Sequence, residues 1–336
     1  MQNTRGWMKR TAPWLALAGV CGMVQPVLAG DYQQSPQVAE FIGEMTRDYG
    51  FASEQLVALF AGVERKQAIL DAISRPAEKA KPWKDYRPIF ITDKRISKGV
   101  EFWKQHEATL ARAEAEYGVP AQVIVAIIGV ETFYGGNTGS YRVMDALSTL
   151  AFDYPPRAPF FRKELREFLL LAREEQVEPL SMTGSYAGAM GLPQFMPSSF
   201  RAYAVDFDGD RHINIWSNPD DAIGSVASYF KRHDWQPGQP VVSAAQVKGE
   251  QAELGLTEGL DPQKNMAELR ALGWSSADPV SDDLPVTAFR LEGAEGAEYW
   301  LGLPNFFVIT RYNRSVMYAM AVNQLAEALV VARGNN

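Results

Sequence analysis

The stretch from Ile124 to Ser140, IVAIIGVETFYGGNTGS, joins an apolar run to a single charged residue and then to paired glycines. An almost continuous apolar run is typical of a segment buried in a protein core. Burial disfavours the charged form of a carboxylate and raises its pKa, so Glu131 is predicted to hold a proton near neutral pH. Such a residue suits a general acid. The structural alternative is a glutamate that pairs with an arginine or caps a turn.

Composition indicates a globular protein. The chain has 336 residues, 46% of them hydrophobic, which is enough for one large core or for a core and a smaller satellite domain. The net charge is -7 and no basic block is present, so we expect no nucleic-acid partner.

The N-terminus has the pattern of an export signal. Arg5, Lys9 and Arg10 precede the apolar run PWLALAGVCGMV, and small residues before Gly30 have the spacing that a signal peptidase recognises. The apolar run is short for a membrane-spanning helix. We therefore predict a signal peptide over residues 1–29, cleavage after Ala29 and a soluble protein of the periplasm.

The only cysteine, Cys21, lies within this segment, so the mature chain is expected to contain no disulfide. A lipid anchor on Cys21 is the alternative. It is disfavoured because Val20 stands where lipoprotein signals place a small residue.

A helical pattern covers most of the chain between Ser35 and residue 235. Ser35 is a candidate N-cap and Gly50 a candidate stop for the first helix. Residues 75–92 are rich in proline and are interpreted as an extended linking arm. One long amphipathic helix is predicted over residues 93–118, and a buried helix from Pro120 to Glu131.

The pattern changes near Gln236, where β-branched and aromatic residues cluster between prolines and glycines. Residues 236–303 are therefore interpreted as a small β-containing domain. Residues 304–336 end in an apolar helix that is expected to pack back on the helical part and the cleft.

A second segment, SYAGAMGLPQFMPSSF from Ser185 to Phe200, is too rich in glycine and proline for a regular helix before Pro197. Such a loop lets backbone amides, Ser185 and Gln194 approach a polar ligand, and Phe195 is predicted to offer a ring face to a sugar. A tightly packed turn is the alternative.

Five segments together resemble the lytic murein transglycosylase B family, which contains the soluble Slt35-like enzymes. In chain order they are GVETFYGG, SYAGAMGLPQFMPSSF, DFDGDRHINIW, DAIGSVASYF and ITRYNRSVMYAMAV. The resemblance implies a mainly α (α+β) fold, with a lysozyme-like helical catalytic core, a helical accessory domain and a small β-containing domain. The accessory domain with its linking arm would cover residues 30–110, and the core, with a calcium-loop-like segment, residues 111–235.

The resemblance also implies an activity. The family cleaves the β-1,4 bond between N-acetylmuramic acid and N-acetylglucosamine in peptidoglycan without water, releasing 1,6-anhydromuramoyl ends during cell-wall turnover. Glu131 matches the catalytic acid and base, and the substrate's own acetamido group would stabilise the anomeric centre. Most glycosidases need two carboxylates. The nearest others, Asp145 and Asp153, are better interpreted as a helix-start residue and a turn residue.

Substrate contacts are implied residue by residue. Asn313 would hydrogen-bond the acetamido group. For each tyrosine the alternative is core packing with a satisfied hydroxyl, which for Tyr229 is equally favoured. The implied positions, the last three on weaker matches, are Ser185, Gln194, Phe195, Tyr312, Asn313, Tyr318, Tyr86, Arg157 and Tyr229.

The segment DFDGDRHINIW has the spacing of a calcium loop. Arg211 stands where such a loop needs glycine, and Ser217 where it needs glutamate. The site is therefore expected to hold calcium weakly, or to hold sodium or Arg211 itself; an Asp-rich surface turn is the alternative. The predicted ligands are Asp206, Asp208, Asp210, the carbonyl of His212 and, by the family alignment, Asp221.

Two rival functions stay open at this point. A goose-type lysozyme-like hydrolase would use the same acid but deliver water, and a non-catalytic peptidoglycan-binding protein would use the cleft for recognition alone. No cofactor is expected for catalysis. The expected partners are peptidoglycan glycan strands and cell-wall synthases.

Overall fold

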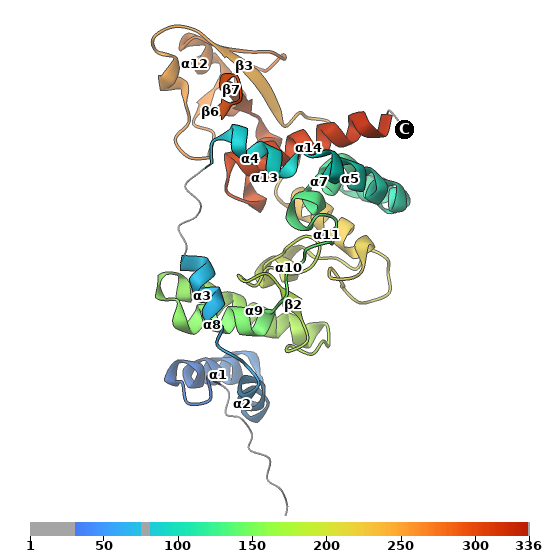
Figure 1. Ribbon diagram of the computed structural model, residues 1–336, viewed down its shortest axis with the longest axis vertical. Helices are drawn as coiled ribbons and strands as arrows, with labels where there is room; N and C mark the ends of the chain where they lie inside the picture. The colour runs from blue at the N-terminus through green and yellow to red at the C-terminus, as the bar shows by residue number, and fades with distance from the viewer. Residues whose placement is uncertain (1–30, 75–80, 335–336) are drawn as a thin grey trace, which may run out of the picture.

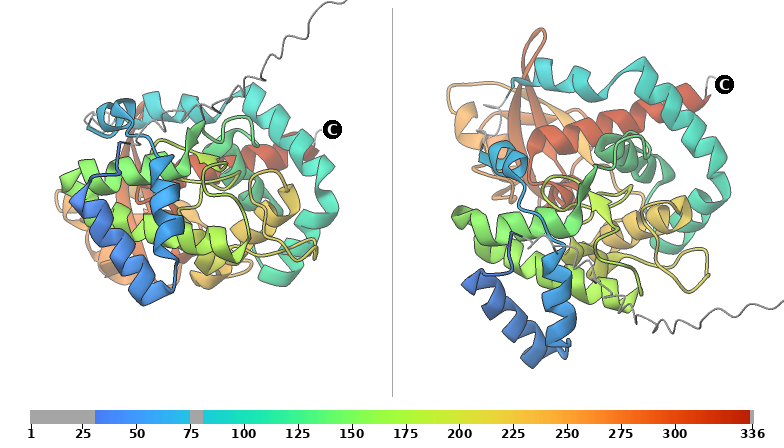
Figure 2. Two further views of the ribbon diagram at one scale, coloured as in Figure 1. Left: turned by 90° about the horizontal axis from the view of Figure 1, so that it is seen from below. Right: turned by 60° about the horizontal axis from the view of Figure 1, so that its bottom comes forward.

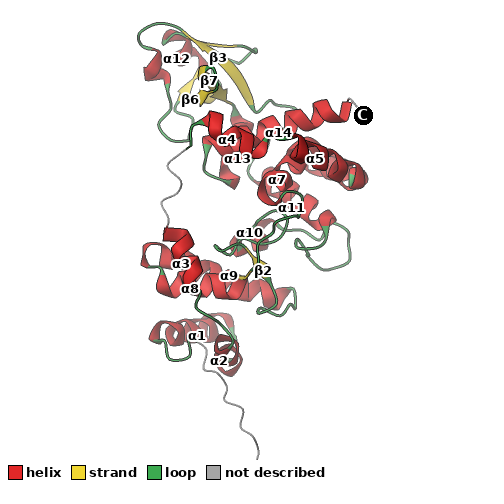
Figure 3. Ribbon diagram, viewed as in Figure 1, coloured by secondary structure: helices red, strands yellow, loops and turns green. Residues whose placement is uncertain are grey.

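Residues 31–74 and 81–334 are described by the computed structural model, which is elongated and mainly helical (Figure 1). The longer strands gather near one end of the long axis, and helices fill most of the remainder (Figure 3). The predicted signal peptide and Cys21 lie outside the described residues.

One hydrophobic core joins the first helices to helices from the middle of the chain. Local signals explain the first of them, because the Ser35 side chain accepts the N–H of Val38 and Gly50 ends the helix at φ 70°. Both ends were predicted. The helices that supply most of this core are α1 (Pro36–Tyr49), α2 (Ser53–Ala61), α3 (Gln67–Ser74), α8 (Val143–Asp153), α9 (Ala158–Glu174) and α10 (Pro197–Tyr203).

A second core surrounds the helix that carries Glu131. Every residue from Val123 to Val130 is buried, as the apolar run predicted. The C-terminal helix lies alongside it and packs back on the helical part, which confirms that prediction (Figure 2). The helices of this core are α4 (Trp83–Phe90), α5 (Asp93–Gln105), α6 (Glu107–Tyr117), α7 (Ala121–Thr132), α11 (Pro219–Arg232), α13 (Pro304–Tyr312) and α14 (Val316–Gly334).

The interpretation of residues 75–92 as an extended arm is wrong for its second half, because α4 is a helix. Trp83, Tyr86 and Phe90 recur at helical spacing and pack against the second core, and Trp83 is only 2% exposed. Their burial outweighs the unfavourable proline inside the helix, Pro88.

The single long helix predicted over residues 93–118 is wrong too, because α5 and α6 meet at His106. This residue has φ -114° and ψ 26°, outside the helical range. Its N–H closes α5 on the carbonyl of Phe102, and its carbonyl accepts the N–H of Leu110 in α6. The bend lets α6 pack against α11.

The predicted β-containing segment is confirmed. A five-stranded antiparallel sheet has the order β4-β6-β7-β3-β5, and the long β6–β7 hairpin places Phe289 opposite Trp300. A small core of its own holds this part together. Its elements are β3 (Val242–Val247), β4 (Lys264–Asn265), α12 (Met266–Ala271), β5 (Trp274–Ser276), β6 (Pro285–Gly293) and β7 (Gly296–Gly302).

The domain boundaries stay predictions. Both helical cores combine helices from either side of residue 110. Within the described residues, no single helix is long and apolar enough to cross a membrane, although two sharply bent helix pairs pass the same test of length and composition when taken together.

Candidate active site

Glu131 lies in the last turn of α7, and its carboxyl group faces the C-terminal helix α14. The hydroxyl of Tyr318 donates to Oε1 of Glu131 at 2.5 Å. Burial raises the pKa of Glu131 to about 7, and the bond from Tyr318 opposes part of that rise. The direction of this rise is the one that the apolar run before Glu131 predicts.

Three tyrosines surround this carboxyl group. Burial raises the pKa of Tyr318, Tyr312 and Tyr86, and the negative charge of Glu131 adds to the rise for each. Their hydroxyls consequently stay protonated at neutral pH. Glu131 is the group of this set that can change its charge near neutrality.

The backbone turns sharply after Glu131. Phe133 and Tyr134 have φ values of 54° and 60°, in the left-handed region. The Tyr134 hydroxyl occupies a slot between α5 and α7, where a Cβ atom would lie 2.2 Å from it at Gly99 and 2.6 Å at Gly129. This slot is not predictable from the sequence, because no pattern links Gly99 to a tyrosine 35 positions later in the chain.

The loop between Ser185 and Phe195 is tied to the end of α7. The Thr132 hydroxyl donates to the Leu192 carbonyl at 3.0 Å, and the Gln194 amide donates to the Thr138 carbonyl at 3.2 Å. Ser185 accepts two backbone N–H groups of its own loop at 3.0 and 3.3 Å. Gln194 and Ser185 therefore shape the loop with the bonds they make within the protein.

The prediction that Phe195 offers a free ring face to a sugar is wrong. Phe195 is 2% exposed, and its ring packs against Tyr229 and Tyr312 at centroid distances of 5.7 and 5.9 Å. The hydroxyls of both tyrosines are also occupied, that of Tyr229 by the Arg311 carbonyl and that of Tyr312 by the Pro193 carbonyl. These three rings form a packed wall.

Two predicted contact residues lie at exposed positions. Asn313 follows α13 directly, and its side chain has no hydrogen-bond partner among the described residues. Arg157 lies between α8 and α9, where its guanidinium covers the ring of Phe160 at 4.5 Å.

The two other acidic candidates are engaged in structural contacts. Asp145 is fully buried in the first turn of α8 and is paired with Arg142 at 2.7 Å. Asp153 accepts the hydroxyl of Tyr32 at 2.6 Å and pairs with Arg65 at 3.2 Å. Neither carboxylate is free to serve as a second catalytic group.

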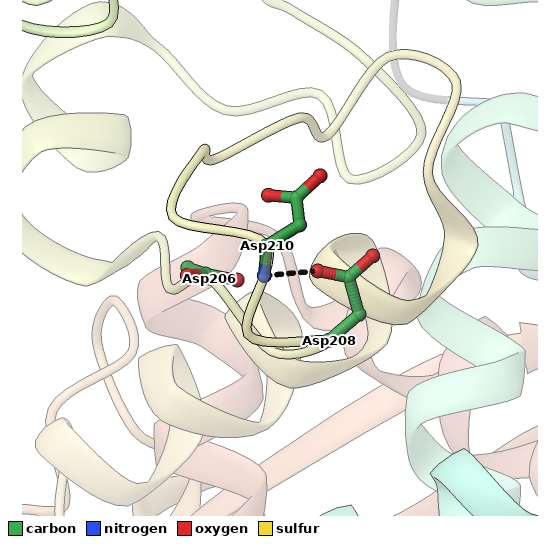
Figure 4. Close-up of side chains that lie close together, drawn as sticks. All are labelled: Asp206, Asp208 and Asp210. Atoms are coloured by element: carbon green, nitrogen blue, oxygen red, sulfur yellow. Dashed lines mark hydrogen bonds between the residues drawn. The ribbon is translucent and has the colours of Figure 1, made fainter.

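The acidic loop after α10 brings three carboxylates together (Figure 4). Single oxygens of Asp206, Asp208 and Asp210 all lie within 4.8 Å of one another. The loop's own N–H groups hold these side chains, including a 3.0 Å bond from the N–H of Asp210 to Asp208. Carboxylate oxygens at this separation suit a hard cation such as calcium. Arg211 has a φ of 77°, the conformation for which such loops use glycine.

The other two predicted ligands differ from these three. Asp221 is not among the gathered carboxylates: it is fully buried and accepts the N–H groups of Phe207 and Asn214, each at 2.7 Å. It therefore anchors both sides of the loop to α11. His212 is exposed, and its N–H donates to Asp210 at 2.8 Å.

Comparison with known proteins gives consistent matches. A family described as Transglycosylase SLT domain matches residues 33–327. The membrane-bound lytic murein transglycosylase B of Escherichia coli (strain K12) is 45% identical over 315 residues, which cover 91% of this chain and 86% of that protein.

Solved structures agree with the sequence matches. The catenated lytic transglycosylase SltB1 from Pseudomonas aeruginosa has a TM-score of 0.89 and 73% identity, covering 90% of this chain and all of the other. Escherichia coli Slt35 in complex with calcium has a TM-score of 0.85 and 45% identity, covering 91% and 96%. SltB3 from Pseudomonas aeruginosa in complex with NAG-anhNAM-pentapeptide has a TM-score of 0.78 and 31% identity, covering 88% and 79%. These matches confirm the predicted lysozyme-like fold.

Proposed function

Because the chain belongs to the transglycosylase SLT domain family and is a lytic murein transglycosylase, we propose that Glu131 serves in turn as the acid and the base of the cleavage. The observation that carries this assignment is the carboxyl group of Glu131 against the apolar core, where burial raises its pKa to about 7. A group of that pKa can both donate and accept a proton near neutral pH.

In the first step, Glu131 donates its proton to the glycosidic oxygen, and the bond from that oxygen to the anomeric carbon of muramic acid breaks. The oxygen leaves with N-acetylglucosamine as a hydroxyl group. Oε1 is held by Tyr318, whereas Oε2 has no hydrogen-bond partner among the described residues. Oε2 is therefore the oxygen that faces the substrate. The acetamido group of the same muramic acid stabilises the positive charge that develops at the anomeric carbon.

In the second step, the Glu131 carboxylate removes the proton of the C6 hydroxyl, whose oxygen forms a new bond to the anomeric carbon. The proton lost in the first step is thereby regained, and no water is consumed. Attack within one sugar ring gains from proximity, so no second carboxylate is needed to position a nucleophile. The occupied carboxylates of Asp145 and Asp153 support this single-residue scheme.

The residues around the cleft fall into two groups: those with a polar group free to bind substrate, and those whose polar groups bond within the protein. Asn313 is exposed and unpartnered, so we assign it the contact with the acetamido group. Tyr86 and Tyr318 line the carboxyl group. Ser185 and Gln194 hold the neighbouring loop in place. The packed rings of Phe195, Tyr229 and Tyr312 form the wall beside that loop. Arg157 is assigned a contact with saccharide or peptide farther from Glu131.

The three gathered aspartates support a structural cation site. The Slt35 relative was solved in complex with calcium, and here Asp206, Asp208 and Asp210 supply the oxygen ligands. Calcium or sodium would stabilise the loop there and takes no part in catalysis. Asp221 anchors the loop to α11 by accepting the N–H groups of Phe207 and Asn214.

Export of the protein to the periplasm would bring it to its peptidoglycan substrate. The charged and apolar N-terminal pattern supports cleavage near Ala29 and release of a soluble form into the periplasm, where peptidoglycan strands lie. Cell-wall synthases are the partners that we propose there. Amino-terminal sequencing of the mature protein tests the cleavage site, and recovery of a lipid-modified Cys21 would contradict it.

Mass analysis of the sugar products tests the reaction itself. Purified peptidoglycan treated with this chain should yield muropeptides lighter than lysozyme products by one water, because each new end carries an internal 1,6-anhydro ring. Hydrated, reducing ends would show that water is the nucleophile and assign the protein to the goose-type hydrolases. Binding without any product would indicate a recognition protein.

A further inference from the structure

Three cations surround one aromatic ring two residues after Glu131. The charged groups of Lys94, Arg95 and Lys98 lie 5.7, 5.1 and 5.5 Å from the centre of the Phe133 ring. All three cations come from the first two turns of α5, and Phe133 is the residue that ends α7. These four residues are called the Phe133 cation cluster.

Helix stability does not explain this arrangement. The N-terminal end of a helix favours negative charge, yet Lys94 and Arg95 lie in the first turn of α5. Lys94 and Lys98 are also four residues apart, a spacing at which like charges repel. Both lysines are exposed, in a chain whose net charge is -7.

The positive charges of the cluster are not neutralised by carboxylates of the described residues. Within residues 31–74 and 81–334, no carboxylate lies within 4.0 Å of a charged nitrogen of these three residues. Arg95 is fixed by bonds to the carbonyls of Ile89 and Gly129, at 2.5 and 3.2 Å. A fixed guanidinium with two free lysines beside it is a suitable receptor for carboxylates.

An aromatic path connects the cluster to Glu131. Arg95 also covers the ring of Phe90 at 5.2 Å, and that ring lies 5.2 Å from the ring of Tyr86. Tyr86 in turn is close enough to Glu131 for the charge of Glu131 to raise its pKa. The cluster therefore lies two rings beyond the catalytic carboxyl group.

We propose that the Phe133 cation cluster binds the carboxylates of the peptide stem carried by the muramic acid at the cleavage site. The inference rests on the proposed function, because a glycan processed at Glu131 is what brings such a stem to this surface. An extended five-residue stem, as in the ligand of the SltB3 relative, reaches at most about 18 Å, enough to extend past two rings.

Titration calorimetry with three fragments tests the proposal on the full chain. The fragments are NAG-NAM-pentapeptide, the same fragment with its peptide carboxyls amidated, and NAG-NAM without peptide, which keeps the lactyl carboxylate. Each ends at its muramic acid, so none contains the bond that the enzyme cuts. Binding is thereby measured independently of the chemistry assigned to Glu131.

The test variant is Lys94→Gln with Lys98→Gln. The matched control is Lys104→Gln with Lys231→Gln, which removes the same charge from exposed positions on α5 and α11. We expect the test variant to bind the pentapeptide fragment about three- to tenfold more weakly than the control does, as two partly screened ion pairs would give. Rising salt should weaken wild-type binding to the level of the test variant.

The amidated fragment separates charge from shape. It should bind wild type and test variant alike, and an equal loss for amidated and native peptide would overturn the proposal. Weakening confined to the peptide-free fragment would assign the cluster to the lactyl carboxylate instead. Unchanged binding of the pentapeptide fragment by the test variant would show that the cluster binds no stem. Hydrated cleavage products, by contrast, would contradict the reaction and leave this binding result intact.

Discussion

The end of α7 and the loop from Asp206 to Asp210 hold the same chemical group in opposite states. Glu131 lies partly buried at the end of an apolar helix, and burial raises its pKa to about 7. Asp208 is exposed, and hydrogen bonds from the Asp210 N–H and the Asn218 amide lower its pKa. The surroundings therefore make one carboxyl group an exchangeable proton donor and the other a permanent anion.

This difference shows why counting acidic residues would mislead. The loop gathers three carboxylates whose oxygens lie within 4.8 Å of one another, an arrangement suited to a cation. Among the described residues, no other carboxyl group acts on Glu131, and Asp145 and Asp153 are engaged elsewhere.

The largest effect is expected from Glu131→Gln. The amide keeps the shape of the side chain but supplies neither a transferable proton nor a carboxylate, so turnover should fall by roughly 10⁴-fold or more. Release of anhydromuropeptides measures this, and sedimentation with peptidoglycan should show that binding survives. Asp208→Ala is the control from the other region and should turn over normally. Normal turnover by Glu131→Gln would refute the role of Glu131.

Asp221→Ala should cost the most stability. It removes a buried carboxylate and leaves the N–H groups of Phe207 and Asn214 without acceptors. Unsatisfied buried donors cost about 1–3 kcal/mol each, so the free energy of unfolding should fall by about 3 kcal/mol. Chemical denaturation measures this loss. Asp208→Ala, at an exposed position, should lose far less; equal losses would mean that Asp221 does not anchor the loop.

Tyr318→Phe should shift the pH dependence of turnover. The bond from Tyr318 lowers the pKa of Glu131, so its removal raises that pKa and keeps the acid protonated to higher pH. The alkaline limb of the pH–rate profile, expected near pH 7 for wild type, should therefore move to higher pH. Tyr312→Phe, whose hydroxyl bonds to Pro193, should leave the limb in place. The same limb position in Tyr318→Phe and wild type would contradict this account of Glu131.

The smallest effect concerns the cation. Millimolar calcium should raise the melting temperature by about 2 °C, because a ligand that binds only the native state stabilises it by mass action. Asp208→Ala should abolish the rise, whereas Asp261→Ala, an exposed aspartate in the β-containing part, should keep it. A melting temperature that does not change with calcium would contradict the cation site and would not affect the role of Glu131.

Sequence patterns succeeded where structure depends on neighbours in the chain. The caps at Ser35 and Gly50, the buried run before Glu131 and the β-containing segment all follow from local signals. The helix α4 was missed because Pro88 suggested a loop, while burial of Trp83 decided otherwise.

For the site, prediction from sequence was limited by contacts between segments that are distant in the chain. A raised pKa at Glu131 was predictable from the apolar run that precedes it. The burial of Phe195 was not, because Tyr229 and Tyr312 come from two remote helices. Asp221 likewise matched a metal ligand by position, and only the fold reveals the two N–H groups that it accepts.

The hydrogen bond between Tyr318 and Glu131 joins residues 187 positions apart, and its donor lies in the final helix. A chain still emerging from the ribosome or a translocation channel cannot close this contact until Tyr318 is free. Contacts of such long sequence separation also form late in folding, since closing a long loop carries a large entropy cost. We therefore expect a chain that stops before Tyr318 to lack the finished site and to leave the cell wall uncut.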